Sequence, residues 1–318
     1  MWEIIAAVVC IVVVAVLLIS FRLFRIAIVR PKKHKDSSGN ISEMNEDQKR
    51  LEQRRKEGVR WFRDMAPEEV SIVSFDGLEL YGRLLLQKRA TRGTVIMMHG
   101  FHSSGEGDFA CQLRHVYELG FNILLPDERS HGKSQGEYIC FGALERYDCR
   151  DWIFFLNEVL GELPIYLYGI SMGASTVMLT SALKLPQNVR GVIADCGYTS
   201  LWDILSVIIK RHFHLPPIPF IPIASLISKA VAGFFFGEAD CEKALKQTEL
   251  PVLLIHGASD DFVPPEMTIS NWRALDGKRR QLFFVADAGH ADAYTTDTYG
   301  YDRMFDGFIA DCEKRRGN

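Results

Sequence analysis

The sequence contains no C-x-x-C pair, no Cys and His spacing typical of a zinc site and no internal repeat. Its seven cysteines are scattered and odd in number, which favours reduced thiols over a disulfide framework. The net charge of −3 gives the chain no overall attraction for nucleic acid. These absences argue against a disulfide scaffold and a zinc protein, and they predict no cofactor, no metal ion and no nucleic-acid partner.

Charge is also missing from Ile4–Phe21, a continuous apolar run. A helix needs about 20 apolar residues to cross a bilayer, and Leu23 and Phe24 extend the run if Arg22 reaches the interface. A core helix of this length normally carries a polar stripe, and a cleaved signal peptide normally has a basic start, whereas this chain begins Met-Trp-Glu. We therefore predict a transmembrane anchor at residues 1–29.

Basic residues follow the apolar run, whereas Glu3 is the only charged side chain before it. The positive-inside rule then predicts a single-pass protein with its catalytic domain in the cytoplasm. Residues 30–66 read as a basic flank and a charged juxtamembrane stalk, in which an exposed helix acting as a solvated spacer is favoured over a partner-binding helix. The basic residues after the run are Arg22, Arg25, Arg30, Lys32, Lys33 and Lys35.

Short apolar, β-branched runs alternate with helical patterns over residues 67–318, which predicts one domain with a mostly parallel sheet and helices on both faces. Eight strands are predicted, at Val70–Phe75, Leu78–Leu86, Thr94–His99, Phe121–Pro126, Pro164–Gly169, Val189–Asp195, Pro251–His256 and Gln281–Ala286. Helices are predicted at Phe109–Leu119, Leu144–Leu160, Met172–Leu185, Glu266–Leu275 and Tyr299–Arg315.

No strand pattern occurs between Gly197 and Leu250. Two apolar helical stretches, 201–213 and 224–236, are separated there by a cluster of prolines. Residues 198–250 are interpreted as a small helical lid over the carboxyl edge of the sheet, where open α/β folds bind ligands. An ordinary crossover with a long loop is the alternative.

The pattern Gly-x-Ser-x-Gly occurs twice, and its context separates the two copies. The copy with Ser171 directly follows a predicted strand and leads into a predicted helix, which is typical of a nucleophile elbow. The copy with Ser134 lies in a polar loop with no helix after it, so we interpret it as a turn.

A serine hydroxyl needs a base to take its proton, and the base needs an acid to orient it. After Ser171, Asp260 and His290 follow the last two predicted strands, so all three residues are expected at the same edge of the sheet. Asp261 and Asp195 are the rivals for the acid. Backbone N–H groups of Met172 and Phe101 are predicted to form the oxyanion hole.

From about residue 70 the chain resembles the α/β-hydrolase superfamily, and within it the serine-aminopeptidase-like and acyl-peptidase-like branch. The resemblance rests on His99-Gly100-Phe101, residues 127–134, Gly169–Gly173, His256–Pro264 and Gly289-His290. It implies a hydrolase with an α/β-hydrolase fold. It also implies a structural role for Asp127, Arg129 and His131, although Ser130 stands where a glycine is common.

Other polar residues carry weaker signals. His99 and His256 are interpreted as packing or loop-anchoring residues, and Glu145 and Asp148 as loop anchors. The pair His212 and His214 lacks a third metal ligand, so a position on the lid surface is favoured. The Phe234-Phe235-Phe236 run fits an acyl site, a membrane contact or simple core packing.

The predicted activity is cleavage of a small or lipid-like acyl ester through an acyl-enzyme. A serine peptidase with the same triad is the alternative. It needs a lid carboxylate to hold a substrate amine, for which Glu238, Asp240 and Glu242 are the candidates. A catalytically silent binding module is disfavoured because the triad is complete.

Overall fold

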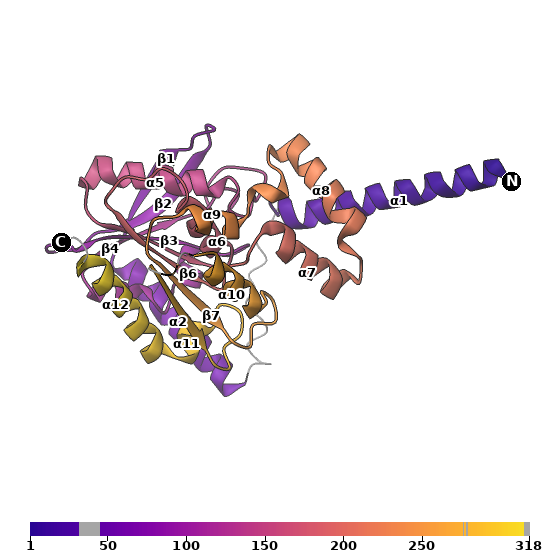
Figure 1. Cartoon of the computed structure of the whole chain (residues 1–318). Coiled ribbons are helices and arrows are strands. Elements are labelled where there is room, and N and C mark those ends of the chain that lie inside the picture. The colour runs from indigo at the N-terminus through magenta and orange to yellow at the C-terminus, as the bar shows by residue number, and fades with distance from the viewer. Residues whose placement is uncertain (32–44, 276, 278, 315–318) are drawn as a thin grey trace.

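The computed structural model describes residues 1–31, 45–275, 277 and 279–314. Its centre is one eight-stranded sheet with the order β1-β2-β4-β3-β5-β6-β7-β8 (Figure 1). The hairpin β1–β2 and the pair β2–β4 are antiparallel, and the remaining pairs are parallel. The strands are β1 Glu68–Val73, β2 Glu79–Leu85, β3 Gly93–Met98, β4 Phe121–Pro126, β5 Ile165–Ile170, β6 Val189–Asp195, β7 Val252–Gly257 and β8 Arg280–Val285. The predicted eight-stranded, mostly parallel sheet is confirmed.

The central strands are buried on both faces because their apolar runs have no polar alternation. In β3, Ile96 and Met98 face one hydrophobic core, and Val95 and Met97 face the other. The first core is covered by α5 Glu145–Leu160, α6 Met172–Thr180, α9 Cys241–Gln247 and α10 Pro265–Ala274. The second is covered by α3 Gly105–Asp108, α4 Leu113–Glu118, α11 Ala293–Thr296 and α12 Thr298–Lys314.

Two predicted helices are shorter in the structure. The helix expected at Phe109–Leu119 is reduced to α4, because Phe109 instead closes the short helix α3 before it. The helix expected at Met172–Leu185 ends at Thr180, and a tight turn follows in which Leu183 N–H donates to the Thr180 carbonyl at 2.9 Å. Both differences concern helix ends, where local patterns define boundaries least well.

The segment 198–250 contains α7 Leu201–Phe213, α8 Pro217–Ala232 and a 3₁₀ turn at Phe236–Glu238, followed by α9. Ser200 caps α7 by accepting a hydrogen bond from Asp203 N–H at 3.0 Å. Two helices are present as expected, with Pro216 between them, but α8 begins at Pro217 and so includes most of the proline cluster. The helix is kinked at Ile218, whose backbone is not helical, and Pro222 lies inside the helix beyond the kink.

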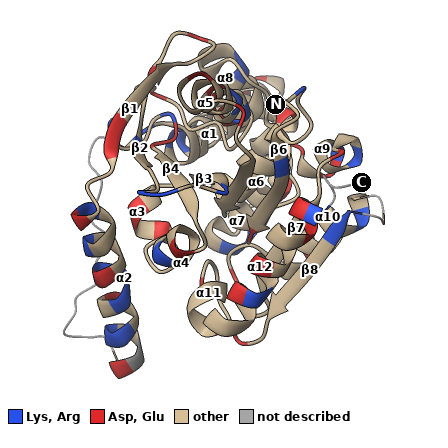
Figure 2. Cartoon of the chain, turned by 90° about the vertical axis from the view of Figure 1, so that its left-hand side faces the viewer, with Lys and Arg blue, Asp and Glu red and all other residues tan. Residues whose placement is uncertain are grey.

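Helix α2 (Glu46–Asp64) forms where a charged stalk is predicted. One side carries closely spaced acidic and basic residues (Figure 2). The other side is not exposed: Phe62 is fully buried, and a Cβ added at Gly58 would lie 1.9 Å from the Ala110 carbonyl oxygen. The helix therefore docks on the domain, which corrects the expectation of a solvated spacer.

Helix α1 (Trp2–Ile28) extends away from the sheet, and α7 and α8 lie beside its base (Figure 1). By length and composition it is the one helix in the described part of the chain that is suited to cross a membrane. Its side chains are largely exposed as far as Ile19, whereas Ser20, Phe24 and Ile28 are buried. The structure therefore confirms an N-terminal apolar helix whose last two turns belong to the folded body.

The chain leaving α1 is held on the domain. The Arg30 guanidinium donates to the carbonyl oxygens of Gly132 and Ser134 at 2.8 and 2.7 Å. The Ile139 N–H donates to the Ile28 carbonyl at 2.7 Å. Lys32, Lys33 and Lys35, which also follow the apolar run, lie outside the described residues.

Candidate active site

Ser171 occupies the sharp turn between β5 and α6, with φ 56° and ψ −115°. This conformation is strained for a residue with a side chain. Two glycines make it sterically accessible. A Cβ at Gly173 would lie 2.0 Å from the Met98 carbonyl oxygen, and one at Gly169 would lie 2.2 Å from the Gly173 carbonyl oxygen. The turn thus has the strand–turn–helix geometry that the sequence predicts.

The structure brings Ser171, His290 and Asp260 together. His290 Nε2 lies 2.9 Å from Ser171 Oγ, and His290 Nδ1 lies 2.7 Å from Asp260 Oδ2. His290 follows β8 and Asp260 follows β7, so three loops at one edge of the sheet contribute to this chain of hydrogen bonds. Asp260 is buried, whereas the His290 side chain is partly exposed.

Both carboxylate oxygens of Asp260 have further partners. Oδ1 accepts hydrogen bonds from Phe262 and Val263 N–H, each at 2.9 Å. Oδ2 also lies 3.1 Å from His256 Nε2. Burial by itself raises the pKa of Asp260, but the hydrogen bonds from His256 and His290 outweigh it and hold the pKa well below its usual range. Asp260 is therefore an anion at neutral pH and able to orient His290.

His256 has the anchoring role that the sequence predicts. Its Nε2 lies 2.9 Å from the Val263 carbonyl oxygen, and its Nδ1 lies 2.6 Å from Thr268 Oγ1. Sequence reasoning missed its contact with Asp260. The signal in the sequence was that Asp260 follows His256 by four residues. The loop after β7 brings the two side chains into contact.

The rival acids point elsewhere. Asp195 Oδ2 accepts a hydrogen bond from Tyr301 OH at 2.9 Å, and burial raises the pKa of Asp195 to about 6. The side chain of Asp261 is exposed. Of the three carboxylates, the one that hydrogen bonds to His290 is Asp260.

Phe101 and Met172, predicted for the oxyanion hole, line the same cavity as Ser171. The loop after β3 lies directly against the serine, since a Cβ at Gly100 would be 3.4 Å from Ser171 Cβ. Gly100 N–H donates to Asp108 Oδ2 at 2.6 Å, which fixes the loop.

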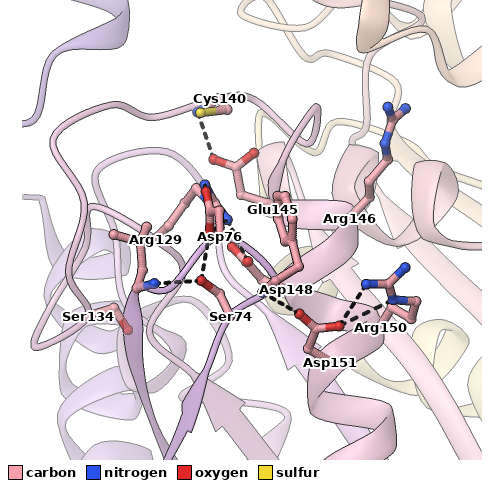
Figure 3. Close-up of polar contacts among 12 residues, drawn as sticks. Ser74, Asp76, Arg129, Ser134, Cys140, Glu145, Arg146, Asp148, Arg150 and Asp151 are labelled. Carbon is pink, nitrogen blue, oxygen red and sulfur yellow. Dashed lines mark hydrogen bonds and ion pairs between the residues drawn. The ribbon is translucent and has the colours of Figure 1, made fainter. Parts of the chain in front are cut away.

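A buried ion network holds Arg129, which lies in the loop after β4 (Figure 3). Arg129 donates to both oxygens of Asp148, each at 2.6 Å, and to Asp76 at 2.9 Å. Burial alone would lower the pKa of Arg129, but the hydrogen bonds and charge of Asp148 more than offset it, so the guanidinium stays charged. Beside it, His131 Nε2 accepts from His102 N–H at 3.1 Å, which ties the loop to the residue after Phe101. These contacts bear out the structural role that the resemblance implies for Arg129 and His131.

Arg129→Met is expected to lower the free energy of unfolding by about 3–5 kcal/mol, because it leaves Asp148 buried without its cation. The measurement is denaturant unfolding of the full chain in detergent, followed by tryptophan fluorescence. Lys133→Met is the matched control: it breaks the exposed pair with Glu69 in the same loop and should cost less than about 1 kcal/mol. Equal losses in the two variants would contradict the prediction.

Three other sequence interpretations are confirmed. Ser134 is buried, and its hydroxyl donates to the Asp127 carbonyl at 2.6 Å, so the second Gly-x-Ser-x-Gly copy is a turn. Glu145 is a loop anchor that accepts from Cys140 and Gly142 N–H at 2.7 and 2.8 Å. His212 and His214 are exposed at the end of α7.

A cavity of about 220 Å³ lies beside Ser171, between the loop after β3, α7 and α8. Among its described lining residues none is charged, and the Tyr198 hydroxyl is already engaged with the Phe141 carbonyl at 2.9 Å. Of the three consecutive phenylalanines, Phe236 lines the cavity, Phe234 is buried and Phe235 is largely exposed.

Glu238, Asp240 and Glu242, the carboxylates considered for binding a substrate amine, do not line this cavity. Glu238 lies 3.3 Å from Lys229 Nζ and accepts from Phe235 N–H at 2.8 Å. Asp240 caps α9 by accepting from Lys243 N–H at 2.9 Å.

Cys196 joins Asp260 and His290 in a group whose donor atoms lie within 4.8 Å of one another. Burial raises the pKa of Cys196 well above its usual value, which keeps the thiol protonated and a poor metal ligand. The imidazole and carboxylate are already hydrogen-bonded in the triad geometry, so these residues do not fit a metal well.

Comparison with known proteins places this geometry in context. A family model described as serine aminopeptidase, S33, matches residues 89–211, which include Ser171 but not Asp260 or His290. The uncharacterized protein YqkD of Bacillus subtilis is 29% identical over 69% of this chain and 72% of its own length. Protein bem46 of Schizosaccharomyces pombe is 21% identical over 78% of each chain.

Solved structures define the fold. The Pyrococcus furiosus esterase Pf2001 matches with a TM-score of 0.62 and 22% identity, over 78% of this chain and 92% of its own. Est1E of Butyrivibrio proteoclasticus, solved with ferulic acid, matches with a TM-score of 0.58 and 20% identity, over 76% and 99%. The chain therefore has the α/β-hydrolase fold. Within that class its sequence is similar to the serine aminopeptidase-like family.

Proposed function

We propose that this protein is a serine hydrolase that cleaves carboxylic acyl esters, with Ser171 as nucleophile, His290 as general base and Asp260 as the orienting acid. The observation that carries the proposal is the hydrogen-bonded chain from Ser171 Oγ through His290 to Asp260, with links of 2.9 and 2.7 Å. Esterases among the structures of the same fold add support.

In the proposed reaction, His290 Nε2 takes the proton from Ser171 Oγ as that oxygen attacks the ester carbonyl. The backbone N–H groups of Phe101 and Met172 stabilise the resulting oxyanion. His290 then gives its proton to the leaving alcohol as the ester C–O bond breaks. Water, activated by the same imidazole, releases the acid from the acyl-enzyme.

The apolar cavity favours an ester over a peptide with a free amino terminus. An aminopeptidase needs an anionic group beside the nucleophile, because a substrate ammonium loses hydration when it binds. No described residue that lines the cavity carries a charge, and Glu238 and Asp240 are engaged elsewhere.

The test is a panel of p-nitrophenyl esters and aminoacyl p-nitroanilides against the full chain in detergent. Esters are expected to be hydrolysed, and aminoacyl anilides to react at least about 100-fold more slowly in kcat/KM. A higher kcat/KM for the aminoacyl anilides than for the esters would contradict the esterase proposal and favour the peptidase alternative.

We further propose that α1 is a retained anchor with residues 45–314 on the cytoplasmic side. In the most apolar stretch of α1 only 6% of the residues are buried, as suits a helix surrounded by lipid. Removal of α1 as a signal peptide would uncover the core surface that Phe24 and Ile28 occupy. The charge asymmetry around the apolar run supports the orientation.

Two measurements test the anchor. The chain purified from membranes is expected to keep residues 1–28 by intact mass, and protease added outside intact cells should leave it uncut. A mature amino terminus beyond Ile28 would show that α1 is a signal sequence. Cleavage between residues 45 and 66 by protease added outside the cells would show that the orientation is the opposite of the proposed one.

A further inference from the structure

The last turns of α1 form one wall of the cavity beside Ser171. Leu23, Phe24, Ile26 and Ala27 line this cavity together with residues of α7 and α8. A simple tether would place no side chain next to the nucleophile. The anchor helix is therefore built into the catalytic domain.

The position of this wall along α1 is informative. A helix of 27 residues is about 40 Å long, whereas the hydrocarbon core of a bilayer is about 30 Å thick. If the exposed first part of α1 spans the core, Leu23 and Ala27 lie at the membrane surface. The wall of the cavity that α1 forms then lies at the boundary between lipid acyl chains and headgroups.

The lid extends the apolar surface of α1. Helix α8 packs against α1, and α7 and α8 both lie at the side from which α1 projects (Figure 1). Large apolar side chains are exposed on and beside these helices, namely Phe213, Ile218, Leu226, Val231 and Phe235. Exposed large apolar side chains on helices that lie beside an apolar helix suit contact with a membrane.

We propose that the substrate is an ester of a bilayer lipid, and that its acyl chain enters the Ser171 cavity sideways from the membrane and lies against Leu23, Phe24 and Ala27 of α1. This inference rests on the proposed function, because it names the substrate of the same site. The uncharged lining suits a hydrocarbon chain, and each methylene buried there should raise kcat/KM about fourfold until the cavity is full.

Ala27→Trp tests the wall, because a large side chain at this position fills the cavity from α1. The full chain in detergent is assayed with p-nitrophenyl esters from acetate to dodecanoate. The ratio of kcat/KM for decanoate over acetate is expected to fall at least tenfold. Ala15→Trp is the matched control on the same helix, at an exposed position outside the cavity, and should leave the ratio within about twofold.

Labelling by a small fluorophosphonate shows whether each variant keeps its reactive serine. A labelled Ala27→Trp protein with the wild-type ratio would overturn the inference. If that variant fails to label, Leu23→Ala is used instead, because it removes side-chain atoms from the same wall and enlarges the cavity. It is expected to shift the preferred ester to a longer chain, and an unchanged preference would equally overturn the inference.

The route of entry is tested in vesicles that contain the wild-type protein. A radiolabelled diacylglycerol is supplied either in the same bilayer or in separate vesicles. Release of fatty acid is expected at least tenfold faster from the same bilayer, and equal rates would show entry from water. Absence of any ester hydrolysis by the wild type, or activity that survives Ser171→Ala, would instead refute the proposed function.

Discussion

Ser171→Ala is expected to abolish labelling by a fluorophosphonate probe and to lower kcat/KM for ester hydrolysis by about 10⁴-fold or more. The physical reason is the loss of the Ser171 hydroxyl oxygen, the atom that His290 is positioned to activate. Ser171 Oγ lies 2.9 Å from His290 Nε2, whereas an alanine methyl group has no proton to give and no lone pair to form a bond.

Ser134→Ala is the matched control because it removes the serine of the second Gly-x-Ser-x-Gly copy. The Ser134 hydroxyl donates a hydrogen bond to the Asp127 carbonyl inside a turn, so labelling by the fluorophosphonate should persist in this variant. Gel fluorescence of the labelled proteins reads out both variants. Labelling that survives Ser171→Ala would refute the assignment of the nucleophile.

Asp260→Asn is expected to lower kcat by about 10⁴-fold while Ser171 remains in place. An amide in place of the carboxylate no longer stabilises the imidazolium that forms when His290 takes the serine proton. It also presents a donor to His290 Nδ1 and so favours the wrong tautomer. The comparison of kcat with KM for a short-chain ester measures the effect, and most of the loss should appear in kcat.

Asp195→Asn is the control for this second prediction. Its carboxylate hydrogen bonds to Tyr301 and not to His290, and the amide keeps an acceptor for the tyrosine hydroxyl. This variant should retain activity within about tenfold of wild type. The reverse pattern, a larger loss at Asp195 than at Asp260, would assign the orienting acid to Asp195 at the end of β6.

Asp260→Asn should also change how stability depends on pH. The pKa of Asp260 is lower in the folded protein than in the unfolded chain, so its ionised form stabilises the fold above its ordinary pKa. That contribution is lost as the pH falls toward the lowered folded-state value. The difference in melting temperature between wild type and Asp260→Asn is therefore expected to be larger at pH 7 than at pH 3.

The strands and helices, and the order in which the site residues follow them, could be predicted because both depend on short stretches of sequence. Apolar runs without polar alternation predict strands buried on two faces, and the short turn around Ser171 needs Gly169 and Gly173 for steric reasons visible in the sequence. Asp260 and His290 were expected at the same edge because the carboxyl ends of neighbouring parallel strands meet there.

Contacts between distant segments could not be predicted in this way. The docking of α2 depends on a few residues such as Gly58 and Phe62, which its charged composition conceals. The sharing of Asp260 between two histidines depends on how one loop folds back. The start of α8 among prolines depends on the kink at Ile218.

The alternation of strands and helices, the tight turn at Ser171 and the apolar helix at the amino terminus could be deduced from the residues alone, because they depend on side-chain size, periodicity and hydrophobicity over short stretches. That Leu23 and Ala27 border the same cavity as Ser171 became apparent only from the folded chain. Nothing in the spacing of residues 23 and 171 encodes that proximity. It follows from packing α1 against α8, through which apolar surfaces far apart in the chain are removed from water together.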